Sequence, residues 1–175
     1  MTYRLLPYTK IDGIRTVTDS GIKSLFNRTV EDGLDKIVLY DGTVQTPEAF
    51  LNMAKAPGTY FYLGYRDKEL IGYVWLNRFE NKTARYHFCA FKEYWGQLAE
   101  IAEFAMTTLL SMKDNTGAYV FDLFTGYVPV WNQAAIKFTL KHGGYSAGEI
   151  PNAIYNAETQ KSEPAEFIYY TRGEK

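Results

Sequence analysis

The chain has 175 residues, a formal net charge of −1 and a pI of about 6.1. This balance disfavours a dedicated nucleic-acid binder, which usually carries a basic excess. A single cysteine, Cys89, excludes an intrachain disulfide and a cysteine-based metal site, and only two histidines make a histidine-rich metal centre unexpected.

The N-terminal half predicts one strand, two helices and two further strands. Tyr3–Tyr8 is short and apolar, as a first strand would be. Thr18 offers a cap for a first helix, and Thr46, followed by Pro47, offers one for a second. Residues 59–65 and 70–79 are predicted to form two strands joined by a polar hairpin turn. Inside them, Gly64 and Gly72 indicate a bulge or a close backbone approach.

The C-terminal half continues with a strand up to Phe91, a glycine turn and a helix over Gln97–Met112. Ala118–Thr125 is predicted as a buried strand that can lie parallel to the strand before that helix. Asn132 caps a further helix that stops at Gly143. A terminal hairpin, Tyr145–Tyr155 and Glu166–Thr171, spans a polar run that we interpret as a solvated turn.

The predicted order is therefore β-α-α-β-β-β-α-β-α-β-β. It indicates a mixed α/β fold, with a mostly antiparallel central sheet and helices on both faces. The length fits a single domain over residues 1–175. No signal peptide and no apolar run of transmembrane length is visible, so we expect a cytoplasmic protein with neither a membrane nor a nucleic-acid partner.

Residues 85–108, RYHFCAFKEYWGQLAEIAEFAMTT, are the stretch with the clearest chemical meaning. An apolar strand ends in a short turn that carries Gly96, and a helix opens directly after it. Such a junction leaves backbone N–H groups pointing one way, beside the positive end of the helix dipole. It predicts an anion site, although most glycine turns before helices bind nothing.

Two local motifs resemble the GNAT superfamily of acetyl-CoA-dependent N-acetyltransferases. Tyr94-Trp95-Gly96-Gln97-Leu98-Ala99-Glu100 resembles the pyrophosphate loop of the ribosomal-protein acetyltransferase branch. The helix that starts Asn132-Gln133-Ala134-Ala135 and ends in Gly143-Gly144-Tyr145 resembles the family's Asn-x-x-Ala helix. The resemblance in element order covers nearly the whole chain, with a fainter likeness to phage-borne members.

The resemblance implies acetyl-CoA as cosubstrate, held by residues of three segments. Backbone N–H groups of Trp95, Gly96, Gln97, Leu98 and Ala99 would hold the pyrophosphate. The strand Phe88, Cys89, Ala90 and Phe91 would pair with the pantetheine amides and separate from the strand Val120–Thr125 to admit it. Asn132, Ala135 and Phe138 would line the thioester end.

Two departures from the family pattern concern the chemistry. The loop lacks the second glycine and contains no arginine, so attraction for the phosphates is expected from its amides. Thr139 stands where the family often has a tyrosine that protonates the leaving thiolate. These departures keep open an alternative: a catalytically impaired GNAT-shaped module that binds acyl-CoA or another protein.

His87 and Asp122 are the catalytic candidates. His87 lies on the expected cleft strand, and the unperturbed pKa of a histidine is near neutrality, as a general base requires, but His87 also fits a half-buried histidine bonded to a neighbour. Asp122 interrupts an apolar strand, and it either reads substrate or is paired structurally. Cys89 is not predicted to be a nucleophile. The acceptor is expected to be an amine-bearing small molecule or protein, and the oligomeric state is open, a homodimer included.

Overall fold

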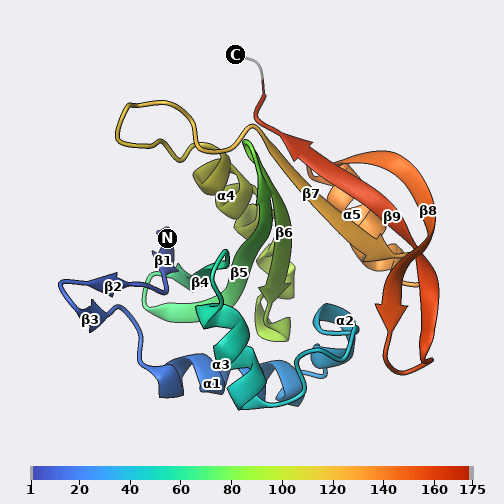
Figure 1. Cartoon of the computed structure of the whole chain (residues 1–175), viewed down its shortest axis with the longest axis horizontal. Coiled ribbons are helices and arrows are strands. Elements are labelled where there is room, and N and C mark those ends of the chain that lie inside the picture. Colours follow the sequence, from blue (N-terminus) through green and yellow to red (C-terminus); the bar gives the residue numbers. More distant parts are fainter. Residues whose placement is uncertain (1, 174–175) are drawn as a thin grey trace. The chain divides into compact units, whose positions relative to one another are not determined.

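A computed structural model describes residues 2–173 (Figure 1). Its main sheet has seven strands, in the order β1-β4-β5-β6-β7-β9-β8. Their bounds are β1 Tyr3–Pro7, β4 Tyr60–Arg66, β5 Glu69–Glu80, β6 Thr83–Ala90, β7 Leu123–Pro129, β8 Tyr145–Asn156 and β9 Lys161–Thr171. All but one of the described pairings between neighbours are antiparallel. The predicted mixed fold is confirmed, and the predicted element order holds apart from two short hairpin strands, β2 (Lys10–Ile11) and β3 (Ile14–Arg15), and the short helix α2 (Asp35–Val38).

The chain divides into two compact units. The first comprises the residues up to Asn77 together with His87–Leu98, and the second comprises Arg78–Tyr86 and the residues from Ala99 onward. Strands β5 and β6 therefore each contribute to both units.

Three helices belong to the first unit: α1 Asp19–Glu31, α2 Asp35–Val38 and α3 Pro47–Lys55. The Thr18 and Thr46 hydroxyls accept the N–H groups of Gly21 and Ala49, which confirms both predicted caps. Helices α1 and α3 lie side by side in Figure 1. Phe50 of α3 meets Phe61 and Tyr73 of the sheet edge-on, with ring centroids 5.6 and 5.3 Å away, and those two rings stack on each other, so aromatic rings pack the core of this unit.

Two glycines shape the strands of the first unit. Gly64 and Gly72 face each other across β4 and β5, and the register shifts directly after Gly64, which confirms the predicted bulge. A Cβ atom on Gly72 would lie 2.2 Å from the carbonyl oxygen of Cys89. The main chains of β5 and β6 thus approach so closely there that only glycine fits, as predicted.

The second unit holds a parallel strand pair and a long hairpin. Thr83–Arg85 of β6 pairs in parallel with Leu123–Thr125 of β7, which confirms the predicted crossover. The connection carries helix α4, Leu98–Leu110, and helix α5, Gln133–Lys141, follows β7. Strand β9 lies between β7 and β8, and Figure 1 shows α5 beside these three strands.

Four segments differ from the prediction, and the first is the short helix α2, Asp35–Val38, which was not predicted. Lys10–Ile11 and Ile14–Arg15 form an unpredicted small hairpin, β2–β3, around Asp12 and Gly13 in left-handed conformation. Lys161–Pro164 belongs to β9 and not to a solvated turn. Ala118–Phe121 precedes β7 and is not part of the strand, because Val120 bonds back to Met112 and the Asp114 carboxylate holds a turn there.

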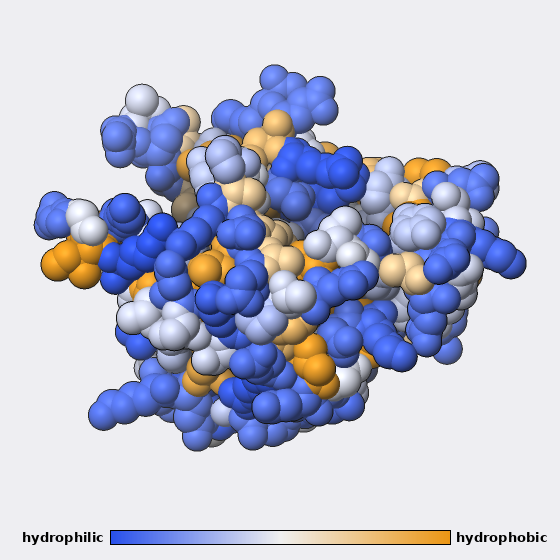
Figure 2. Space-filling model, turned by 60° about the horizontal axis from the view of Figure 1, so that its bottom comes forward, coloured by the Kyte–Doolittle hydropathy of each residue, from blue (hydrophilic) through white to orange (hydrophobic). Residues whose placement is uncertain are grey.

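The face drawn in Figure 2 is mainly hydrophilic, with hydrophobic residues in small separate patches. Ile11 and Ile14 of the β2–β3 hairpin are among the exposed apolar side chains. Within residues 2–173, none of the helices has both the length and the apolar character needed to cross a membrane.

Candidate functional site: a 3-10 turn at the end of β6

Strand β6 ends in a tight turn and not in an open glycine loop. Lys92–Gln97 forms a 3-10 helix, η1, and α4 begins at Leu98. The Asp32 carboxylate, at the end of α1, accepts the N–H of Lys92 at 3.0 Å and fixes the start of η1. At its end the Leu98 N–H donates to the Trp95 carbonyl. Leu98 was expected among the phosphate donors, but its amide is engaged inside the turn.

Gly96 has a property that neither packing nor backbone conformation explains. Its φ is not left-handed, and a Cβ atom placed on it would meet no atom within 4 Å. Glycine in a helical turn costs about 0.5–1 kcal/mol relative to alanine. The structure thus leaves space beside Gly96 that a ligand could approach closely.

Two arginines from distant parts of the sequence meet this turn. Arg28 of α1 forms an ion pair with Glu93 and lies 3.9 Å from the centroid of the Phe91 ring. Arg66, the last residue of β4, donates to the side-chain oxygen of Gln97. The loop itself contains no arginine, and since these two lie far away in the sequence, no local signal could have revealed them.

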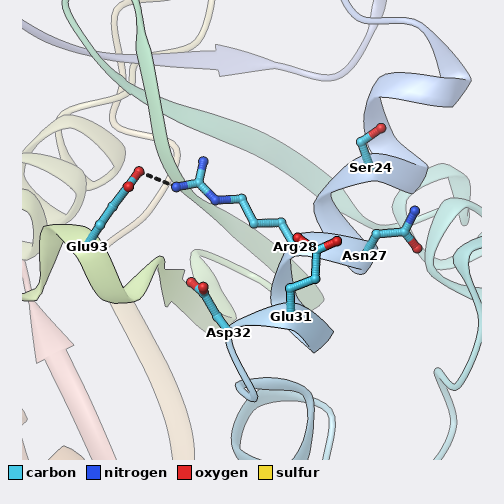
Figure 3. A pocket seen from close by; sticks show the side chains of 6 residues that line it. All are labelled: Ser24, Asn27, Arg28, Glu31, Asp32 and Glu93. Atoms are coloured by element: carbon cyan, nitrogen blue, oxygen red, sulfur yellow. Dashed lines mark hydrogen bonds and ion pairs between the residues drawn. The ribbon is translucent and has the colours of Figure 1, made fainter.

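A polar pocket of about 430 Å³ opens beside the same turn. Figure 3 shows the Arg28 side chain reaching from α1 toward Glu93 across it. Its lining residues are Ser24, Asn27, Arg28, Glu31, Asp32 and Glu93. Three carboxylates against one guanidinium make it acidic.

The backbone of β6 offers fewer open groups than expected. The Phe91 N–H donates to the Ile71 carbonyl, and the Ala90 carbonyl accepts the indole N–H of Trp95 at 3.0 Å. Successive residues of a strand direct their polar groups to opposite edges, so Phe88 and Ala90 point away from β5. Of the four predicted strand residues, these two have the orientation that pantetheine pairing needs.

Cys89 is buried and chemically quiet. Burial raises the pKa of its thiol to about 12, although a hydrogen bond with Tyr73 acts in the opposite direction. A thiol that stays protonated at neutral pH is a poor nucleophile, in agreement with the prediction.

His87 stacks on Trp75 with the two rings 4.4 Å apart and nearly parallel. Its Nε2 lies 3.2 Å from Oδ1 of Asn77. Because a carboxamide oxygen can only accept, this contact requires a proton on Nε2. The ring is thus half-buried and oriented by two neighbours, and its role as a base stays a prediction.

No family model matches the sequence, and no curated relative is found. Solved structures with the same fold do exist. An acetyltransferase from Salmonella typhimurium that modifies the N-terminal serine of ribosomal protein L7/L12 superposes with a TM-score of 0.77 at 15% identity, covering 98% of this chain and 96% of that one. This chain has the fold of the GNAT acetyltransferases.

Two further structures share the GNAT fold and contain ligands. A spermidine N-acetyltransferase from Vibrio cholerae, in complex with CoA and spermine, gives a TM-score of 0.66 at 13% identity over 95% of each chain. The microcin C7 self-immunity acetyltransferase, in complex with acetyl-CoA and AMP, gives 0.69 at 15% identity over 88% of this chain and 87% of that one.

The second unit carries the other predicted cofactor residues of the GNAT fold. Asn132 accepts the Ala135 N–H at 3.1 Å, which confirms it as the cap of α5. Phe138 is half-buried against His142, with ring centroids 4.5 Å apart. Ala99 is half-buried in the first turn of α4. Their contacts with a cofactor, and the separation of Phe88–Phe91 from Val120–Thr125, stay predictions.

Asp122 is not a buried strand residue. It precedes β7, its side chain is 48% exposed, and its carboxylate pairs with Arg172 at 2.7 Å. Its backbone N–H donates to the Lys82 carbonyl, and its own carbonyl accepts the Arg172 N–H. This is the structural pairing that the sequence left open, and it ties the start of β7 to the end of β9.

Proposed function

We propose that this chain is an N-acetyltransferase that binds acetyl-CoA at η1 and transfers its acetyl group to a primary amine. The observation that carries the proposal is Gly96, a glycine without a conformational or packing reason, placed at the strand–turn–helix junction of a GNAT fold. The exposure of Trp95 and Gly96 supports access from solvent.

The residues present fit a coenzyme A ligand. The backbone amide of Ala99, in the first turn of α4, would face the pyrophosphate together with the dipole of that helix, whereas Trp95, Gly96 and Gln97 lie inside η1, where i→i+3 bonding engages backbone N–H groups. Phe88 and Ala90 would pair with the pantetheine amides. The Ala90 carbonyl would then either accept a second hydrogen bond beside that from the Trp95 indole or lose the indole bond. Asn132 keeps its side-chain NH₂ as a donor, since its oxygen serves the cap of α5.

The bound cosubstrate supplies an activated acetyl thioester that an unprotonated amine can attack. We assign His87 to remove the proton from the acceptor amine, because Asn77 and Trp75 orient its ring. We assign Asp122 to the ion pair with Arg172 and not to the reacting atoms. The acceptor is an amine-bearing small molecule or a protein N-terminus.

The decisive experiment uses two variants of Gly96. Isothermal titration should show that the wild-type protein binds acetyl-CoA and that Gly96→Asp abolishes binding by placing a carboxylate in the phosphate space. Gly96→Ala is the matched control: a methyl group meets no atom there, so folding should be unchanged by circular dichroism and binding only weakened. No binding by the wild-type protein at millimolar acetyl-CoA would overturn the proposal.

A thiol-release assay with spermidine, spermine and a peptide that begins with serine then tests turnover. Acetyl-CoA-dependent release with any of them supports the transferase. Binding without release across a broad amine panel would favour the catalytically impaired module.

A further inference from the structure

We propose that Arg66 is a positioning residue for acetyl-CoA binding, which holds the end of η1 in its binding conformation through Gln97. The inference rests on the proposed function. It concerns a residue outside the loop, about thirty positions earlier in the sequence, on the hairpin between β4 and β5.

The backbone that carries Arg66 is fixed on both sides. Arg66 pairs with Tyr3 of β1 and with Glu69 of β5. The next residue, Asp67, exchanges two hydrogen bonds with Thr2: its N–H donates to the Thr2 carbonyl at 2.7 Å, and its carboxylate accepts the Thr2 N–H at 2.9 Å. The guanidinium therefore projects from a rigid base.

The guanidinium divides its donors between two partners. One terminal nitrogen donates to the Gln97 side-chain oxygen and the other pairs with the Glu69 carboxylate. Its carbon lies 5.1 Å from the centroid of the Tyr94 ring, which is itself buried inside the turn. Only 17% of the Arg66 side chain is exposed, so this is a built contact and not a loose surface pair.

Gln97 is the place where this contact matters. It is the last residue of η1 and directly precedes Leu98, the first residue of α4. A fixed Gln97 side chain therefore restrains the junction at which η1 ends and α4 begins, and the first N–H groups of α4 start from that junction. Anchoring at the start, from Asp32 to Lys92, and at the end, from Arg66 to Gln97, restrains the turn at both ends.

Position, and not net charge, is the main contribution of Arg66. Its charge is already matched by Glu69, just as that of Arg28 is matched by Glu93. A lysine would keep the charge, but its single ammonium cannot reproduce the planar fork that spans Gln97 and Glu69. Arg66→Lys and Arg66→Ala should therefore behave alike.

The test measures acetyl-CoA affinity and steady-state kinetics for Arg66→Ala, Arg66→Lys and Gln97→Ala. Each should raise the Kd and the KM for acetyl-CoA about tenfold, while kcat at saturation and the KM for the acceptor change less than about twofold. The double variant Arg66→Ala/Gln97→Ala should be no worse than either single one, because both remove the same contact. Lys68→Ala is the matched control, since it deletes an exposed cation from the same hairpin turn.

The outcomes separate the two levels of the proposal. If the wild-type protein binds no acetyl-CoA, the proposed function fails. If it binds, and the Arg66 and Gln97 variants bind like Lys68→Ala, the role of Arg66 is overturned. If Arg66→Lys alone bound acetyl-CoA as tightly as the wild-type protein, Arg66 would act through its charge, and the positioning role would be overturned. Should Arg66→Ala not fold, Gln97→Ala carries the same test without touching the hairpin.

Discussion

The indole N–H of Trp95 donates to the main-chain carbonyl of Ala90 at 3.0 Å, although Trp95 is 48% exposed. This bond turns the indole back along β6 and places it over the backbone group that pantetheine pairing would use. Trp95 should therefore sense whatever occupies that edge of the strand.

We expect acetyl-CoA to quench the fluorescence of Trp95. Titration should change the emission of the wild-type protein and of Trp131→Phe, but not that of Trp95→Phe. Trp131 is a suitable control because it is similarly exposed, at 45%, and its indole bonds to a carboxylate far along the chain. If acetyl-CoA changed the emission of Trp131→Phe no more than that of Trp95→Phe, the ligand would bind away from Trp95.

Gly72→Ala should destabilise the protein strongly. Its methyl group would lie 2.2 Å from the Cys89 carbonyl, where only main-chain movement can relieve the overlap. We expect the free energy of unfolding in urea to fall by about 3 kcal/mol. Gly64→Ala, directly across the ladder, meets its nearest atom at 3.5 Å and should change this energy by less than about 1 kcal/mol.

Stability should fall at alkaline pH. Burial raises the pKa of the Cys89 thiol from 9.0 to about 12 and that of Tyr62 from 10.0 to about 12. Both groups stay protonated in the folded protein while the unfolded chain loses its protons, so their contribution is complete below about pH 9 and is lost as the pH rises toward 12. Urea midpoints measured between pH 8 and 11 should decline, less steeply in Cys89→Ser. A flat profile in the wild-type protein would contradict this.

Asp122→Asn should leave catalysis intact. The carboxylate is half exposed and pairs with Arg172, so its loss should lower the free energy of unfolding by less than about 1 kcal/mol. Arg172→Gln should have a similar effect. We expect kcat to stay within about twofold of the wild-type value. A hundredfold loss of kcat in Asp122→Asn, without such a loss in Arg172→Gln, would show that Asp122 acts on the reacting atoms.

His87→Gln should lower kcat about a hundredfold while the Kd for acetyl-CoA stays unchanged, because a general base acts on the acceptor and not on cofactor binding. Asn77→Ala, which removes the partner of Nε2, should have a smaller effect on kcat. Equal activity of His87→Gln and the wild-type protein would make His87 a structural residue.

Local signals predicted most of the fold. Thr18, Thr46 and Asn132 cap helices where their side chains suggested, because a cap is a contact between residues two or three positions apart. The chain order of the main-sheet strands followed from alternation and turn residues. These features depend on neighbours in the sequence, so the sequence is enough to place them.

Features that depend on distant partners were missed. The polar run before Glu166 suggested a solvated turn, but Pro164 within it lies in β9, where the register with the adjacent β8 shifts between Ile150 and Ile154 and a missing backbone N–H is tolerated. Asp122 suggested a buried carboxylate, but in the structure it is half exposed and pairs with Arg172, fifty positions later in the sequence. Arg28 and Arg66 at η1 could not be predicted for the same reason, since only the folded backbone brings them there.

Strands β5 and β6 each serve both compact units, and the first unit is assembled from two separate stretches of the chain. Neither compact unit can therefore be expressed as one uninterrupted fragment. A truncation within residues 78–98 would remove part of both units. Dissecting what this protein does in a cell calls for single substitutions in the intact chain, and deletion mapping would be misleading.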